Sequence, residues 1–235
     1  MQKQELLIPT FINNFPGIHL EGLILLASRP GMGNSSFSLY LIKDALLQNL
    51  KVCLITYQES KSFLDRMLNK FVEEEQLKSL TIIDDFPYLN HSQIKLPNLF
   101  QEDFDLIVLD DLESSLGRHE LGEQDRNELI DTLSTLSTTY KIPVLVNSTL
   151  GKALEERGGD LKPMFRNVNW CRNLSVCSSQ IFSIYRPGYY GITEDENGTD
   201  VLNLIELLCL KSDFEKKGRF VVDDEKFKLG RLVRE

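Results

Sequence analysis

Short apolar runs alternate along this chain with segments whose apolar residues recur at helical spacing. Apolar runs bounded by turn residues are typical of buried strands, and apolar residues three and four positions apart are typical of helices packed on one face. We therefore predict strands at 23–28, 51–57, 80–83, 104–110, 143–147 and 181–185, and helices at 34–49, 61–75 and 128–140. Strands that alternate with helices predict a doubly wound α/β fold, with a mainly parallel sheet flanked by helices.

The last third of the chain departs from this alternation. Residues 151–179 have a weaker pattern interrupted by glycines and a proline, which predicts a loop excursion. Residues 186–200 are acidic and rich in turn residues, which predicts an exposed loop. Beyond it, 202–211 and 219–222 are typical of antiparallel strands, with 226–229 as a candidate third. We also expect residues 113–123 to form a polar loop between a strand and a helix.

Length and composition fit one globular domain. The chain has 235 residues, of which 42% are hydrophobic, enough for a substantial core. We expect a single domain over residues 1–235, in which 1–22 form a leading segment rich in turn residues. No apolar run approaches the roughly 18 residues that span a bilayer, and the N-terminus has no signal-peptide cleavage pattern. These features predict a cytoplasmic protein without a membrane segment.

Charge and cysteine usage narrow the classes of function further. The net charge is −9, whereas a domain that grips nucleic acid by itself usually has a basic face. Local basic loops would still allow an acidic protein to bind DNA, so the charge weakens that class without excluding it. The four cysteines contain no C-x-x-C pair, which favours buried thiols over a zinc site.

The stretch 23–37 (LILLASRPGMGNSSF) joins a predicted strand to a predicted helix through a glycine-containing turn. A phosphate-binding loop has the pattern G-x-x-x-x-G-K-[ST] in this position. Gly33 and Ser35 match the second glycine and the hydroxyl residue, while Ser28 replaces the first glycine and Asn34 replaces the lysine. The alternative is an ordinary strand–turn–helix corner that needs small residues.

Several stretches, in the same order along the chain, resemble the bacterial replicative helicase family DnaB. The turn ASRPGMGNS is similar to the family's A-R-P-S-M-G-K-T. Further similarities are 8–10 with I-P-T-G, 106–113 with L-I-M-I-D-Y-L-Q, 143–157 with P-V-I-A-L-S-Q-L-N-R-S-L-E-Q-R, 180–186 with a strand ending I-Y-R, and 207–211 with a strand ending G-K-Q-R. The resemblance implies a RecA-like motor domain of superfamily 4, without the family's separate N-terminal helical domain.

The resemblance also implies a nucleotide site for ATP or ADP with Mg²⁺. Ser35 and Asp110 would hold the metal, as a P-loop hydroxyl and a strand-end carboxylate do in related enzymes. The cofactor-binding residues implied are Ser28, Arg29, Pro30, Gly31, Met32, Gly33, Asn34, Ser35, Ser36, Thr149 and Lys211.

Departures from the family pattern fall on the residues that would do the chemistry. Asn34 cannot place a cation on the β- and γ-phosphates, and losing one charge-assisted contact costs about 1.5–3 kcal/mol, or ten- to a hundredfold in binding. Gln58 stands where the family has a glutamate that polarises water, and a carboxamide is a poor base. Glu59 is the adjacent acid, which we expect on the opposite strand face unless the alignment shifts by one.

Two more departures concern phosphate contacts. Thr149 stands where the family has a phosphate-sensing glutamine. The family's Lys and Arg, two residues apart, reach the γ-phosphate of the neighbouring subunit; Lys211 is kept, whereas Asp213 replaces the arginine. An arginine finger contributes roughly 10³–10⁵ in rate where measured, and we consider Arg219 or Lys216 as substitutes.

The family's DNA-facing segment is rich in arginine, lysine and glycine, but its counterpart at 113–128 is not. This segment holds acids at Glu113, Glu120, Glu123, Asp125 and Glu128 against Arg118 and Arg126. Single-strand binding needs phosphate neutralisation and stacking aromatics. The segment has neither, so we favour a solvated loop and do not expect DNA binding there.

These observations leave three hypotheses. The first is a DnaB-like protein that hydrolyses ATP poorly or not at all and binds a protein partner, or itself, through the surface that its relatives use for rings, in DNA replication or mobile-element maintenance. The second is an active ATP-dependent helicase or translocase subunit; its candidate catalytic residues are Gln58, Glu59 and Asp110. The third is a recombination or signalling ATPase of the wider RecA-like group. Separately, the pair Tyr189–Tyr190 either stacks on a ligand or pins its loop.

Overall fold

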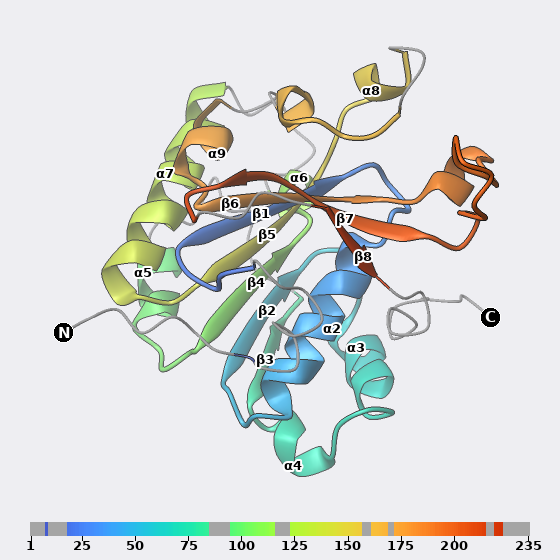
Figure 1. The fold of residues 1–235 in the computed structure, drawn as a ribbon. Coiled ribbons are helices and arrows are strands. Elements are labelled where there is room, and N and C mark those ends of the chain that lie inside the picture. The colour runs from blue at the N-terminus through green and yellow to red at the C-terminus, as the bar shows by residue number, and fades with distance from the viewer. Residues whose placement is uncertain are drawn as a thin grey trace.

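The computed structural model describes residues 8, 18–84, 95–115, 123–156, 161–168, 172–214 and 219–222. They form one sheet of eight strands, in the order β3-β2-β4-β5-β1-β6-β7-β8 (Figure 1). The strands are β1 (Leu23–Ser28), β2 (Val52–Thr56), β3 (Leu80–Ile83), β4 (Leu106–Asp110), β5 (Val144–Thr149), β6 (Gln180–Tyr185), β7 (Ile205–Ser212) and β8 (Arg219–Val222). Neighbouring strands from β3 to β6 are parallel, and β6–β7 and β7–β8 are antiparallel. The predicted fold class is confirmed.

Helices cover both faces of this sheet (Figure 1). One face carries α2 (Asn34–Leu46), α3 (Lys61–Leu68) and α4 (Glu74–Leu77); the other carries α5 (Lys95–Phe100), α7 (Glu123–Tyr140) and α9 (Arg172–Cys177). The remaining short elements are α6 (Leu112–Ser115), α8 (Ala153–Glu156), η2 (Phe165–Val168) and η3 (Pro187–Tyr190). Among the described residues, no helix is long and apolar enough to cross a membrane.

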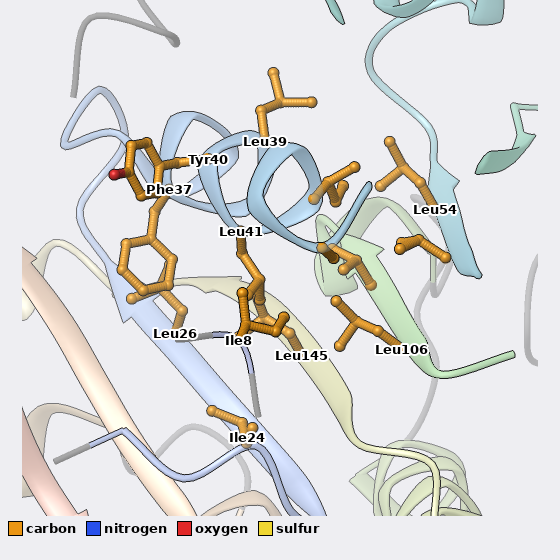
Figure 2. Close-up of a cluster of buried hydrophobic side chains, with 14 of the residues drawn as sticks. Ile8, Ile24, Leu26, Phe37, Leu39, Tyr40, Leu41, Leu54, Leu106 and Leu145 are labelled. Atoms are coloured by element: carbon orange, nitrogen blue, oxygen red, sulfur yellow. The ribbon is translucent and has the colours of Figure 1, made fainter. Parts of the chain in front are cut away.

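The core divides into two layers, one on each side of the sheet. Figure 2 shows the layer under α2, where Phe37 and Leu41 of the helix lie over Leu26 of β1 and Leu145 of β5. Every residue of β1, β2 and β4 is buried, as expected for central strands of a sheet covered on both faces. This packing fixes the end of β1 and the start of α2, between which the candidate loop lies.

The predicted helix at 61–75 is wrong in its second half. The structure ends α3 at Leu68 and begins α4 at Glu74. The break follows from a local cap, because the Glu73 N–H donates to Gln76 Oε1 at 3.0 Å, which satisfies a donor that a continuous helix would have bonded to its own backbone. Apolar spacing continues across the break, so the periodicity could not show it.

Two predicted loops contain helical turns. In the predicted loop 113–123, α6 occupies 112–115, and α7 begins at Glu123 rather than at 128. The excursion at 151–179 holds α8, η2 and α9. Each of the three short α-helices is anchored by one buried leucine, at Leu112, Leu154 and Leu174, which is too few apolar positions to give a readable period.

Some of the remaining predictions can be compared with the structure, and others concern residues outside the described part of the chain. Of the predicted exposed loop 186–200, residues 191–200 are exposed throughout, whereas 186–190 contain η3 and the buried Pro187. Cys53 and Cys209 are buried thiols. The candidate strand at 226–229 and most of the leading segment 1–22 lie outside the described residues.

Candidate functional site at the carboxyl end of β1

The loop between β1 and α2 has the backbone shape of a phosphate-binding turn. Gly31 and Gly33 have φ angles of 79° and 111°, in the region that favours glycine. Gly33 is the N-cap of α2, and the Phe37 N–H donates to its carbonyl at 2.9 Å. A glycine turn that leads into a helix N-terminus is the backbone arrangement that binds phosphate.

The Asn34 side chain points toward the sheet. Its amide Nδ2 donates to the carbonyl oxygens of Ser148, at 3.0 Å, and Leu26, at 3.4 Å. Its Oδ1 is buried without a hydrogen-bond partner among the described residues. The amide therefore links the start of α2 to β5 and β1, and the loop receives no positive charge from this position.

A buried hydrogen-bond network joins α2 to β4 and β5. Asp110 Oδ1 accepts from Ser35 Oγ at 3.1 Å and from Asn147 Nδ2 at 2.6 Å. The same Nδ2 lies 2.9 Å from Ser38 Oγ. Burial raises the pKa of Asp110, and the hydrogen bonds from Asn147 and Ser35 oppose that rise. Ser35 and Asp110, the predicted metal pair, are thus in direct contact.

Glu113 of α6 lies beside the end of β5. Its Oε1 accepts from Ser148 Oγ at 2.7 Å and from the Thr149 N–H at 3.0 Å. Burial raises the pKa of Glu113 to about 7, despite these two hydrogen bonds. Thr149 is exposed. At this position, where the family has a phosphate-sensing glutamine, the hydrogen bond to Glu113 is donated by the backbone N–H.

The two residues considered for water activation lie beyond the end of β2, which ends at Thr56. Gln58 Nε2 donates to Asp111 Oδ2 at 2.6 Å. The Glu59 carboxylate is close enough for its charge to raise the pKa of Asp110. Side chains alternate between the two faces of a sheet only within a strand, and Glu59 lies beyond the end of β2. Strand alternation therefore gives no reason to expect Glu59 on the opposite face from Gln58.

Lys211 makes its contacts within this chain. Its Nζ donates to the carbonyl oxygens of Val176, at 3.1 Å, and Ser178, at 2.5 Å, at the end of α9. It also lies 3.4 Å from Asp213 Oδ1. Arg219, considered as a substitute for the missing arginine, lies 2.7 Å from the buried Glu206. Lys216 lies outside the described residues.

Other residues of the predicted loop support the fold. Ser28 is fully buried, and its Oγ accepts from the Ile184 N–H at 2.7 Å. Arg29 Nε donates to Glu155 Oε1 at 2.9 Å, and Met32 is 2% exposed. Pro30 and Gly31 are exposed, whereas Ser36 is partly buried.

Tyr189 is a residue of this site that the sequence pattern did not place there. The sequence left it open between a ligand contact and a loop anchor. In the structure its ring lies against Gly31 of the candidate loop. No signal in the sequence joins the two positions, because their contact depends on the pairing of β1 with β6.

These contacts determine what the site can hold. The loop backbone fits a phosphate group, and Ser35 with Asp110 fits Mg²⁺, which prefers oxygen ligands and retains several waters. The positions that would neutralise a terminal phosphate do not fit equally well, because Asn34 is neutral and bonded to the sheet while the Lys211 ammonium is bonded to carbonyl oxygens.

Comparison with known proteins bears on this geometry. No model of a protein family matches the sequence. The replicative DNA helicase DnaB of Geobacillus stearothermophilus is 26% identical over 227 residues, which cover 83% of this chain and 48% of the helicase. The replicative DNA helicase DnaC of Bacillus subtilis (strain 168) is 24% identical over 226 residues, with the same two shares. Over most of its length the chain is therefore similar to DnaB replicative helicases. It spans about half the length of the curated relatives it matches.

Solved structures agree on the fold. A solved ATPase domain superposes with a TM-score of 0.71 at 15% identity, covering 94% of this chain and 87% of that domain. A DnaB-like replicative helicase, reported with its interactions with primase, superposes with a TM-score of 0.67 at 17% identity, covering 84% of this chain and 54% of the helicase. The predicted RecA-like fold and DnaB resemblance are confirmed.

Proposed function

We propose that this chain is a DnaB-like RecA-fold module that hydrolyses ATP slowly or not at all and acts by binding a protein. The observation that carries the proposal is the Asn34 side chain, a neutral amide hydrogen-bonded to Ser148 and Leu26. In a phosphate-binding loop this position holds a lysine that reaches the β- and γ-phosphates. Without that cation the transition state loses more electrostatic stabilisation than the ground state does, because charge develops on the transferred phosphoryl group.

Three further positions support low turnover. Gln58 is a carboxamide bonded to Asp111. At the sensor position Thr149 offers a short side chain, and its backbone N–H is bonded to Glu113. Lys211 is bonded to carbonyl oxygens at the end of α9. Each position lies on the same reaction path, so their effects on the barrier act in the same direction.

A chain that hydrolyses ATP slowly or not at all can still act by binding another protein, and this is the role that we propose. One structural relative is described with its interactions with primase; for this chain we propose a protein partner of a replication or mobile-element machine, or a second copy of the chain, bound at the surface its relatives use for rings. We do not include DNA binding, because residues 113–128 are acidic in sequence; residues 116–122 of that segment lie outside the described part of the chain.

A second candidate function is an active ATP-dependent helicase or translocase subunit. One observation favours it, the contact between Ser35 Oγ and Asp110 Oδ1 at 3.1 Å. A P-loop hydroxyl and a strand-end carboxylate hold Mg²⁺ in related enzymes, and this contact supports the same role for Ser35 and Asp110. In this case another subunit supplies the missing cations.

Phosphate release from ATP and Mg²⁺, with and without single-stranded DNA, separates the two functions. We expect turnover far below the 1 s⁻¹ or more of ordinary enzymes, roughly a hundredfold or more lower. Asp110→Ala serves as the site variant, and Asp103→Ala, a carboxylate whose side chain is 93% exposed, is the matched control. Turnover near 1 s⁻¹ that is lost in Asp110→Ala and kept in Asp103→Ala would establish the active subunit instead.

A further inference from the structure

An exposed aromatic ring lies directly on the candidate phosphate loop. Tyr189 belongs to η3, which follows β6, and it is 53% exposed. A Cβ atom placed on Gly31 would lie only 3.1 Å from Tyr189 Cε2. Glycine suits this position because of its φ of 79°, and a side chain here would also require the Tyr189 ring to shift by a few tenths of an ångström.

Neighbouring aromatic rings hold this tyrosine in place. Tyr190 packs edge-on against Tyr189, with ring centroids 5.3 Å apart, and stacks on Tyr185 of β6 at 5.9 Å. Edge-to-face and offset-stacked pairs at these separations are favourable beyond the area they bury. The sheet thus supports the Tyr189 ring through Tyr190, while about half of the residue faces solvent.

The ring and the carboxylates lie on opposite sides of the loop. β1 pairs with β5 on one edge and with β6 on the other. The β5 side carries Asp110 at the end of β4 and Glu113 bonded to the end of β5. The β6 side carries Tyr189. A phosphate group in the loop would therefore have acidic groups on one side and an aromatic surface on the other.

The acidic side disfavours additional phosphate groups. Glu59 and Asp111 add their charges near Asp110; a Mg²⁺ ion held by Ser35 and Asp110 would offset part of this charge, and Asn34 supplies no further cation. Each further phosphate that extends toward this side brings negative charge toward carboxylates, and like charges repel strongly at short range where water is partly excluded. Planar groups on the other side gain from stacking on a tyrosine.

We propose that the loop binds a nucleoside diphosphate whose base stacks on Tyr189, and that it does not prefer a nucleoside triphosphate. This inference rests on the proposed low-turnover function and specifies the ligand of the same site. The base supplies binding energy that the missing lysine would otherwise provide to the phosphates. The bound nucleotide then acts as a regulatory ligand that signals the presence of nucleoside diphosphate, and its hydrolysis does not drive the protein's action.

Calorimetric titration of the full chain with ADP, ATP and inorganic tripolyphosphate, each with Mg²⁺, tests the proposal. We expect ADP to bind at least as tightly as ATP. Tyr189→Ala should weaken ADP binding about five- to a hundredfold, the effect of removing one stacking partner of a base, and Tyr189→Phe should retain it. Tripolyphosphate should bind all these proteins alike. Ile192→Ala, at a 37% exposed residue of the same loop, is the matched control and should bind ADP like the wild type.

Three results would overturn the proposal: ATP bound tenfold or more tighter than ADP, ADP binding unchanged in Tyr189→Ala, or no ADP binding by the wild type at millimolar concentration. A loss of tripolyphosphate binding in Tyr189→Ala equal to the loss for ADP would also contradict it, because the ring would then shape the loop and not bind the base. These outcomes concern ligand binding alone and do not depend on the rate of phosphate release. A failure of the proposed function would appear as fast turnover, so the two failures are distinguishable.

Discussion

Three polar side chains that the sequence assigns to a nucleotide site are hydrogen-bonded to other residues of the protein. Asn34 bonds to Ser148 and Leu26, Gln58 to Asp111, and Lys211 to the end of α9. A hydrogen bond between neutral groups contributes about 0.5–1.5 kcal/mol to stability, and one that involves a charged group contributes about 1.5–3 kcal/mol. These polar groups therefore help to stabilise the fold, Asn34 at the end of β1, Gln58 beyond the end of β2 and Lys211 beside the start of β6.

Glu113 gives a prediction about pH and stability. Its pKa is raised from 4.5 to about 7 in the folded protein. Below pH 4.5 the group is protonated in the folded and unfolded states alike; as the pH rises it ionises first in the unfolded chain, so its contribution to stability is lost by about pH 7. Glu113→Gln keeps an acceptor for Ser148 and Thr149 and cannot ionise. We expect the free energy of unfolding of the variant to gain on the wild type by up to about 3 kcal/mol between about pH 5 and pH 8.

Urea denaturation at both pH values measures this difference. Glu74→Gln, at an exposed position of α4, is the control and should show the pH dependence of the wild type. If Glu113→Gln shows that same pH dependence, the Glu113 carboxyl titrates in its ordinary range and is not held in a buried environment.

At the scale of elements, α2 connects the loop to the core. Its inward side chains pack on β1, β4 and β5 (Figure 2), and this packing sets where the helix N-terminus lies. Burial of this face stabilises the helix more than its propensity does, since a helix of 13 residues is marginal on its own. The loop geometry therefore depends on core packing well below it.

Leu41 tests that dependence. It is 1% exposed, whereas Leu47, just past the same helix, is 45% exposed. Leu41→Ala should lower the free energy of unfolding by about 2–5 kcal/mol, through lost burial and the cavity left behind. Leu47→Ala should change it by no more than about 0.5 kcal/mol. Thermal and urea denaturation of the two variants give the comparison, and equal losses would show that α2 does not dock as described.

The elements that sequence patterns predicted correctly are those with many apolar positions. The strands at the centre of the sheet are continuous apolar runs, so their burial could be read directly. α8 has one buried leucine, Leu154, and gave no signal. The partners of Asn34 and Lys211 could not be predicted either, since Asn34 bonds to a carbonyl 114 positions away and Lys211 to carbonyls 33 and 35 positions away. The contact of Tyr189 with Gly31 depends on the sheet order in the same way.

At the scale of the whole molecule, the chain combines a RecA-like sheet with a net charge of −9. The fold of a DnaB-type ATPase domain is retained at 15–17% identity to the solved structures. Fold and activity are separable, because the fold depends on buried apolar residues and the activity on a few charged ones at the strand ends. Here the first set is kept, and we propose that Asn34 replaces the cation of the second set.

The most direct test is a calorimetric titration of ATP and Mg²⁺ into the wild type and Asn34→Lys, with Asn34→Ala as the control that removes the amide without adding charge. We predict that Asn34→Lys binds ATP ten- to a hundredfold more tightly than the wild type, the worth of about one charge-assisted contact, and that Asn34→Ala does not. Wild-type ATP binding as tight as that of Asn34→Lys would contradict this, because the site would then already hold a cation on the phosphates.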